Sequence, residues 1–262
     1  MTYVWVDIFV FLIGLCVGSF LNVLRVRLPL EEPFAWGRSK CRSCSETIAW
    51  YDNIPLLSFI LLRGKCRKCH TPIGWMYPIM ELITALLILA TWCYFKSPLP
   101  ATLYTIGLIA PLILISFIDL EHLIIPDVIS LPAIPLAVVI QLIVSPWPWQ
   151  QTLISSGIGI AVGGGVLALV ALTYEKIRKQ EGLGWGDVKL MAWLGAYFGW
   201  QGVIVILLWS SVAGTIIGSL YLLLSKKSAQ HPIPYGPFIA GAGILYFFYG
   251  QLVVSWYLRL VL

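Results

Sequence analysis

The apolar positions of this chain fall into long runs, separated by short polar stretches. Eight runs can be distinguished, at residues 4–24, 77–95, 101–118, 128–144, 153–174, 188–200, 203–224 and 235–258. Most are close to the ~20 residues that a helix needs to cross the hydrocarbon core of a bilayer. The pattern predicts an all-α, polytopic membrane helical bundle of about eight transmembrane segments. The short sixth run could be re-entrant.

One polar stretch is long enough to form a module outside the membrane. It follows the first apolar run and contains four of the six cysteines. The first run lacks a basic start and a small-residue cleavage site, so we interpret it as a retained segment. We therefore expect a first transmembrane segment at 1–24, a loop domain at 25–76 and a membrane-embedded domain of about seven segments at 77–262.

Composition supports a membrane protein and excludes several other classes. Apolar residues make up 59% of the 262 positions and charged residues 11%, whereas soluble domains average about 45–50% and 25%. These values exclude a soluble globular enzyme, a disordered chain and a disulfide-stapled secreted domain. Glycine pairs spaced four apart within the runs predict close helix packing; they are Gly14/Gly18, Gly159/Gly163, Gly195/Gly199 and Gly214/Gly218.

The basic residues predict the orientation of the segments. If the long loop is cytoplasmic and the segments alternate from there, fifteen of the 17 basic residues lie on the inner side, and only Lys96 and Arg259 lie outside. Lys and Arg gather in cytoplasmic loops of membrane proteins. The distribution therefore favours eight segments with both termini outside, and the net charge of +5 is no sign of a nucleic-acid partner.

The loop carries two CxxC pairs, Cys41/Cys44 and Cys66/Cys69, with 21 residues between them. Four thiolates at this spacing are typical of a tetrahedral Cys₄ zinc site, which is closed and structural. A redox pair or uncoordinated thiols are the alternatives, while a cytoplasmic loop argues against stable disulfides. We expect His70 to be an exposed loop residue. Cys16 and Cys93 lie in apolar runs and are expected to be buried small apolar side chains.

Acidic residues near the apolar runs are the candidates for chemistry. With the alternation above, Asp119 lies at the inner end of the third segment and Asp187 at the inner start of the sixth. Two carboxyls that share a site do not both ionise cheaply, so one keeps a proton. The ionised carboxylate can take a proton from water while the protonated one polarises a carbonyl and then protonates the leaving amine. The pair is therefore a candidate for peptide hydrolysis.

Each acid also has a structural interpretation. Asp127 follows Pro126 at a segment start, where a carboxylate favours the helix N-terminus, and Asp187 could serve as such a cap too. Glu121 and His122 could be solvated loop residues. Glu81, in the second segment, is interpreted as a hydrogen-bonding group of the bundle. None of the three histidines, at 70, 122 and 231, has an evident nucleophile beside it.

Several stretches together resemble one family, the bacterial type IV prepilin peptidases. They are Gly18-Ser19-Phe20-Leu21-Asn22-Val23 with Arg27-Leu28-Pro29, the two CxxC pairs around 51–58, Tyr77-Pro78, Phe117-Ile118-Asp119-Leu120 with Ile125-Pro126-Asp127, Gly184-Trp185-Gly186-Asp187-Val188-Lys189, and Pro234-Tyr235-Gly236-Pro237-Phe238. The resemblance runs in order along nearly the whole chain.

The resemblance implies an intramembrane aspartic protease of the GxGD type, with Asp119 and Asp187 as catalytic acids. It implies cleavage of the basic leader from type IV prepilins and type II secretion pseudopilins at the cytoplasmic face of the bacterial inner membrane. Because members with the Cys₄ loop often also N-methylate the new N-terminus, it implies S-adenosylmethionine as a cosubstrate beside structural zinc.

Two other classes of function compete with this interpretation. Carboxylates at a membrane edge also serve as proton relays in transporters, but the sequence shows no repeated halves and that reading gives the Cys₄ loop no purpose. A non-catalytic assembly scaffold would use the loop for docking and would tolerate replacement of both aspartates.

Overall fold

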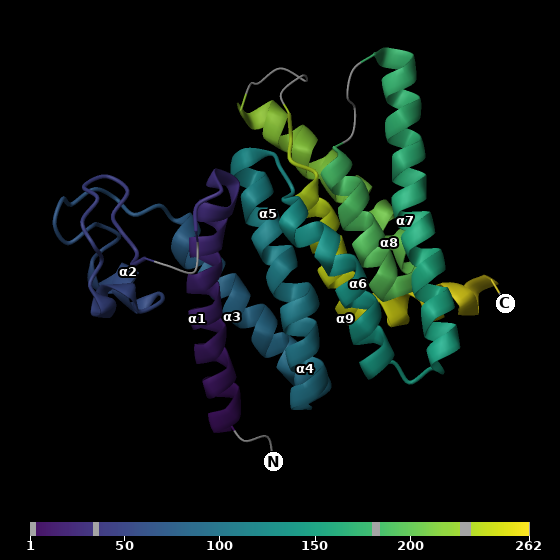
Figure 1. Ribbon diagram of the computed structural model, residues 1–262, viewed down its shortest axis with the longest axis horizontal. Helices are drawn as coiled ribbons and strands as arrows, with labels where there is room; N and C mark the ends of the chain where they lie inside the picture. The colour runs from purple at the N-terminus through teal and green to yellow at the C-terminus, as the bar shows by residue number, and fades with distance from the viewer. Residues whose placement is uncertain (1–3, 34–36, 180–183, 226–231, 262) are drawn as a thin grey trace. The chain divides into compact units, whose positions relative to one another are not determined.

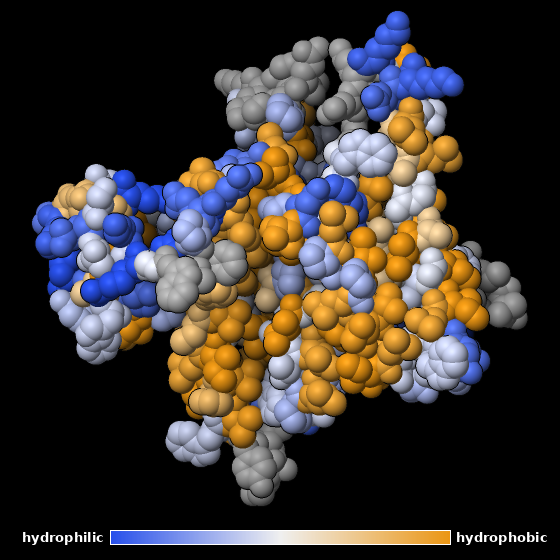
Figure 2. Space-filling view, in the orientation of Figure 1, coloured by the Kyte–Doolittle hydropathy of each residue, from blue (hydrophilic) through white to orange (hydrophobic). Residues whose placement is uncertain are grey.

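The computed structural model describes residues 4–33, 37–179, 184–225 and 232–261, and in these ranges the regular elements are helices. Within these described ranges, seven helices are long and apolar enough to cross a membrane, which confirms the all-α membrane bundle. The chain divides into two compact units, Met1–Phe117 and Ile118–Leu262. In Figure 2 hydrophilic residues gather over the segment around α2, and apolar residues dominate the surfaces of the long helices.

The first unit is built on a close pair of helices. Its elements are α1 (Val4–Arg27), η1 (Leu28–Leu30), η2 (Trp50–Asn53), α2 (Leu57–Leu61), α3 (Met76–Phe95), α4 (Pro98–Tyr104) and η3 (Thr105–Ile109), leading into α5 (Ala110–His122). α1 packs against α3 (Figure 1). A Cβ on Gly14 would lie 2.6 Å from the Ala85 Cα, and one on Gly18 would lie 2.7 Å from the Glu81 Cα. The predicted role of this glycine pair in close packing is confirmed.

The second unit contains α6 (Asp127–Val144), α7 (Trp149–Arg178), α8 (Trp185–Ser225) and α9 (Gly236–Val261), together with the end of α5. α8 packs against α6, α7 and α9, and α7 and α8 run side by side in Figure 1. Gly159 of α7 and Gly195 of α8 face each other so closely that neither position has room for a Cβ. The close helix packing that the sequence predicted at Gly159 and Gly195 is therefore confirmed.

The described residues contain seven membrane-length helices, whereas eight segments were expected, because the apolar runs 188–200 and 203–224 both lie in helix α8. A straight helix of 41 residues would be about 60 Å long, twice the hydrocarbon core of a bilayer. However, Gly199 leaves the helical conformation with φ 65° and ψ −176°. A Cβ on Gly163 would lie within 3.2 Å of both the Met191 carbonyl oxygen and Val203 Cγ2, although twelve residues of straight helix span about 18 Å. α8 thus folds back on itself at Gly199.

The end of the first arm of α8 is stabilised by neighbouring side chains. A helix that stops leaves its last carbonyl oxygens without helical partners. Here the Ser156 hydroxyl donates to the Ala196 oxygen at 2.8 Å, and the Gln141 side-chain amide donates to the Tyr197 oxygen. Side chains from α7 and α6 therefore satisfy the carbonyls that the fold at Gly199 exposes.

Gly199→Ala is expected to lower the free energy of unfolding by about 1–3 kcal/mol, because its backbone conformation is nearly exclusive to glycine. The added Cβ would also lie 2.8 Å from Ser155 Oγ. Thermal unfolding of the purified protein in detergent measures the change. Gly157→Ala is the matched control, since nothing lies within 4 Å of its Cβ position. Equal stability of the two variants would contradict the reversal at Gly199.

Candidate active site and cysteine cluster

Asp119 and Asp187 come from helix ends that meet in the second unit. Asp119 is in the last turn of α5 and is 5% exposed, while Asp187 is in the first turn of α8 and is 9% exposed. The two carboxyls are close enough to interact electrostatically. Buried acids that lie this close are what the carboxylate-pair hypothesis requires.

Two glycines and one isoleucine shape the surroundings of the aspartates. A Cβ on Gly186 would lie 2.7 Å from Ile125 Cβ, and one on Gly236 would lie 3.2 Å from Ile125 Cδ1. Ile125, in the α5–α6 connection, therefore packs against the backbone just before Asp187 and against the start of α9. Glycine permits this close approach of backbone and side chain.

The start of α9 contacts Asp119 directly. The Gly236 backbone N–H donates to Asp119 Oδ2 at 2.9 Å, and a Cβ at position 236 would lie only 2.7 Å from that oxygen. The preceding residue is held in place by the second arm of α8, because the Tyr235 hydroxyl hydrogen-bonds Ser210 at 2.8 Å. Sequence reasoning gave Gly236 no role; its signal is a glycine between Tyr235 and Pro237 at the start of an apolar run.

The other acids have structural surroundings. Asp127 begins α6, as expected, and its carboxylate pairs with Lys189 Nζ at 2.6 Å. This ion pair ties the first turn of α6 to the first turn of α8, two residues beyond Asp187. Glu121 and His122 are both exposed, in line with solvated positions, although they lie in the last turn of α5. His231 lies outside the described residues.

Glu81 belongs to the first unit and has the hydrogen-bonding role that was expected. It is 8% exposed and accepts a hydrogen bond of 2.9 Å from the Leu56 backbone N–H. Leu56 has a positive φ of 56°, a conformation that is costly for a leucine. The bond holds this turn of the polar loop against α3.

The four loop cysteines form one cluster. Their Sγ atoms all lie within 4.8 Å of one another, and those of Cys41 and Cys69 are 3.7 Å apart. Tetrahedral zinc with Zn–S bonds of ~2.3 Å places its sulfurs about 3.8 Å apart. The described cysteines are free thiols, and His70 is exposed. The cluster therefore fits a Cys₄ metal site.

Two matching turns present these thiols. In the first, the Cys41 N–H donates to the Glu46 oxygen, and in the second the Cys66 N–H donates to the Thr71 oxygen, both at 2.9 Å. The residue after each CxxC, Ser45 or His70, has a positive φ near 57°. Each CxxC pair therefore lies in a tight turn of the same kind, although neither positive-φ position is a glycine.

Hydrogen bonds distribute charge unequally among the thiols. The Thr71 hydroxyl, then its backbone N–H, lowers the pKa of Cys69 to about 6. At Cys44 the backbone N–H of Glu46 favours the thiolate, but desolvation and the neighbouring thiols outweigh it and raise the pKa to about 11. Without a cation, these closely spaced thiols cannot all ionise. A bound metal ion would offset the repulsion between the thiolates and so allow all four to act as ligands.

Ion pairs close the polar loop around the cluster. Arg67 forms a bidentate pair with Asp52, with N–O distances of 2.7 and 2.6 Å, and its guanidinium holds the pKa of Asp52 below the usual value. Lys68 pairs with Glu46 at 2.6 Å and so joins the second turn to the first. Cys16 and Cys93 are exposed on α1 and α3, so the expectation that they are buried was wrong.

Comparison with known proteins adds independent findings. Residues 12–95 match the model of the bacterial peptidase A24 N-terminal domain, and residues 106–219 match that of the type IV leader peptidase family. The prepilin leader peptidase/N-methyltransferase of Aeromonas salmonicida (strain A449) is 34% identical, over 97% of this chain and 94% of its own. The enzyme of the same name from Myxococcus xanthus is 37% identical, over 84% of this chain and 64% of its own. That of Aeromonas hydrophila is 35% identical, over 95% of this chain and 92% of its own. No solved structure matches the chain.

Proposed function

The chain belongs to the type IV leader peptidase family, and from this premise we propose that it is a two-aspartate endopeptidase of the membrane that removes the basic leader of prepilins. The observation that carries the proposal is the meeting of two buried carboxyls, Asp119 and Asp187, at the ends of α5 and α8. The family relation and the names of the relatives give no support to a transporter.

The two carboxyls perform the hydrolysis in this proposal. The ionised one removes a proton from water, whose oxygen attacks the scissile carbonyl carbon. The protonated one donates to the carbonyl oxygen, and a proton then passes to the leaving amine as the C–N bond breaks. The Gly236 N–H fixes the position of Asp119 Oδ2, while Ile125 packs beside both acidic segments and limits the entry of water.

The finer parts of the proposal have separate support. Pseudopilins of type II secretion follow from the sequence resemblance. The inner membrane, with the aspartates on the cytoplasmic side, is supported by the basic residues, of which Lys226 and Lys227 lie outside the described residues. The segment 25–76 is assigned to zinc binding and 77–262 to peptidase function.

N-methylation of the new N-terminus is the second activity proposed. It is supported by the names of the relatives, which join leader peptidase to N-methyltransferase. S-adenosylmethionine would supply the methyl group. Zinc in the Cys₄ cluster would hold the loop together, since four thiolates leave a tetrahedral ion no open position.

A reconstituted reaction tests both activities. The purified protein in liposomes is incubated with a prepilin, with and without S-adenosylmethionine, and the products are identified by mass spectrometry. We expect one cut after the basic leader, and a pilin one methyl group heavier when the cosubstrate is present. If several prepilins all remained uncut, the peptidase proposal would be overturned and the non-catalytic assembly scaffold would become the favoured function.

Gly236→Ala is expected to reduce kcat for leader cleavage on the order of 10²-fold with little change in KM. Its Cβ would displace Asp119 Oδ2 or the start of α9, and displacements of about 1 Å in an active site have costs of this size. Gly241→Ala in the same helix is the control, since nothing lies within 4 Å of its Cβ position. Equal kcat values for both variants would refute a positioning role for Gly236.

A further inference from the structure

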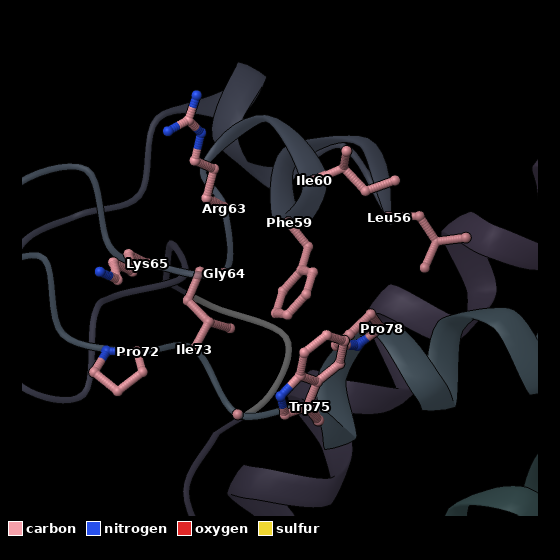
Figure 3. Close-up of a pocket in the computed structure, with 11 residues that line it drawn as sticks. Leu56, Phe59, Ile60, Arg63, Gly64, Lys65, Pro72, Ile73, Trp75 and Pro78 are labelled. Carbon is pink, nitrogen blue, oxygen red and sulfur yellow. The ribbon is translucent and has the colours of Figure 1, made fainter.

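The polar loop contains an apolar hollow on the side that joins α3. The hollow has a volume of about 710 Å³, within the range of small-ligand sites. Figure 3 shows Phe59 pointing toward Trp75 and Pro78, with Arg63 and Lys65 extending away from them. The rings of Phe59 and Trp75 have their centroids 5.0 Å apart. The interior of the hollow is thus apolar and its rim is basic.

Large apolar side chains beside the hollow are exposed. Ile60 and Leu61 of α2 are each 69% exposed, and Trp75 is 71% exposed. Trp75 immediately precedes Met76, where α3 begins and enters the proposed membrane region. An exposed Trp at the end of a spanning helix is typical of the membrane–water interface, and the exposed Ile and Leu of α2 add apolar surface of the kind that marks interaction sites. The chain connection therefore places the hollow where lipid is available.

The two cations at the rim have no acidic partner among the described residues. Arg63 and Lys65 are both exposed, and no carboxylate lines the hollow. By contrast, the neighbouring Arg67 and Lys68 are paired with Asp52 and Glu46. The fold neutralises the second pair of cations and leaves the first pair free to bind an anion. The same charge would repel a basic leader peptide and the sulfonium of S-adenosylmethionine.

We propose that this hollow is a binding site for an acidic phospholipid. An acyl chain lies against Phe59, Ile60 and Trp75, and Arg63 and Lys65 bind the phosphate group. Basic side chains next to an anionic leaflet are attracted to it, and the apolar lining adds burial that a free phosphate would not supply. The lipid would hold the Leu56–Trp75 segment against the bilayer.

Hydrogen exchange of the full-length, zinc-loaded protein in nanodiscs tests the proposal. The two lipid compositions are phosphatidylcholine alone and phosphatidylcholine with phosphatidylglycerol. We expect backbone amides 57–65 to exchange on the order of tenfold more slowly in the anionic discs, in line with two cations near an anionic surface. Soluble glycerol phosphate added to the neutral discs is expected to have no effect.

Two double variants separate a site from general attraction. Arg63→Gln with Lys65→Gln should abolish the slowing, whereas Lys40→Gln with Arg42→Gln removes the same charge from the first CxxC turn and should preserve it. The zinc content of each variant shows whether its loop is folded. Ile60→Gln keeps the charge but removes apolar surface from the hollow, so it should also weaken the slowing of exchange in the anionic discs. The proposal would be overturned if exchange were equal in the two lipid compositions, or if the two double variants had equal effects. It would also be overturned if glycerol phosphate, or a prepilin added to the neutral discs, slowed the exchange on its own.

Discussion

Asp119→Asn and Asp187→Asn are each expected to reduce leader cleavage on the order of 10³-fold or more while leaving the helices folded. Asparagine keeps the shape of the side chain but can neither accept the proton of the attacking water nor return one to the leaving amine, and positioned acid–base groups contribute factors of about 10²–10⁴. Both acids are buried in the second unit, so we expect no exposed acid to take over their proton transfers. Initial rates on a purified prepilin measure the loss.

Asp127→Asn is the matched control for these variants. It also changes an aspartate in the first turn of a membrane segment, but Asp127 is exposed and paired with Lys189. Exposed ion pairs contribute at most about 1 kcal/mol, so we expect this variant to lose less than about tenfold in rate. A 10³-fold loss with Asp127→Asn, or a retained rate with Asp119→Asn, would refute the assignment of the pair.

Removal of zinc is expected to unfold the segment 37–75 and leave the helices of the second unit intact. Structural zinc supplies about 10–16 kcal/mol to small zinc-binding folds, and 37–75 has only the short helices η2 and α2 around its cysteine cluster. Metal analysis should find about one zinc per chain. After chelation, hydrogen exchange should become fast in 37–75 and remain slow in α6–α9.

Serine variants give this prediction a matched comparison. Cys41→Ser and Cys66→Ser should lose zinc, because each removes one of four thiolate ligands. Cys16→Ser and Cys93→Ser should retain it, because these thiols lie on α1 and α3 and outside the cluster. Zinc-free protein from a metal-replete preparation, or equal loss in all four variants, would contradict a structural Cys₄ site.

The sequence predicted the features that depend on residue type and period. Apolar runs marked the membrane segments, and the two CxxC spacings marked the cluster that the structure assembles. Asp119 and Asp187 were brought together by alternating the segments across a membrane, which placed both at one face. The predictions of the membrane bundle and of the cysteine cluster were confirmed, because hydrophobic length and ligand spacing are local properties of the chain.

The remaining features depend on contacts between distant residues. Hydropathy separated the runs 188–200 and 203–224, close to the reversal of α8, but it could not show that Gly199 adopts a conformation nearly exclusive to glycine. The Gly236 N–H that binds Asp119 comes from 117 residues away, and the Lys189–Asp127 pair from 62. Every residue except proline has a backbone N–H, so the sequence does not show which one will donate to Asp119. Likewise, the position of a lysine in the sequence does not show which acid it will pair with.

The central claim is that Asp119 and Asp187 act as one catalytic unit, and a double-variant cycle tests it most directly. Cleavage rates of the purified protein in liposomes are compared for the parent, the two single asparagine variants and the variant with both substitutions. Groups that act as a unit give strongly non-additive losses, so the double variant should be no slower than either single variant. Losses that multiply, so that the double variant is slower by the product of the two factors, would contradict the account.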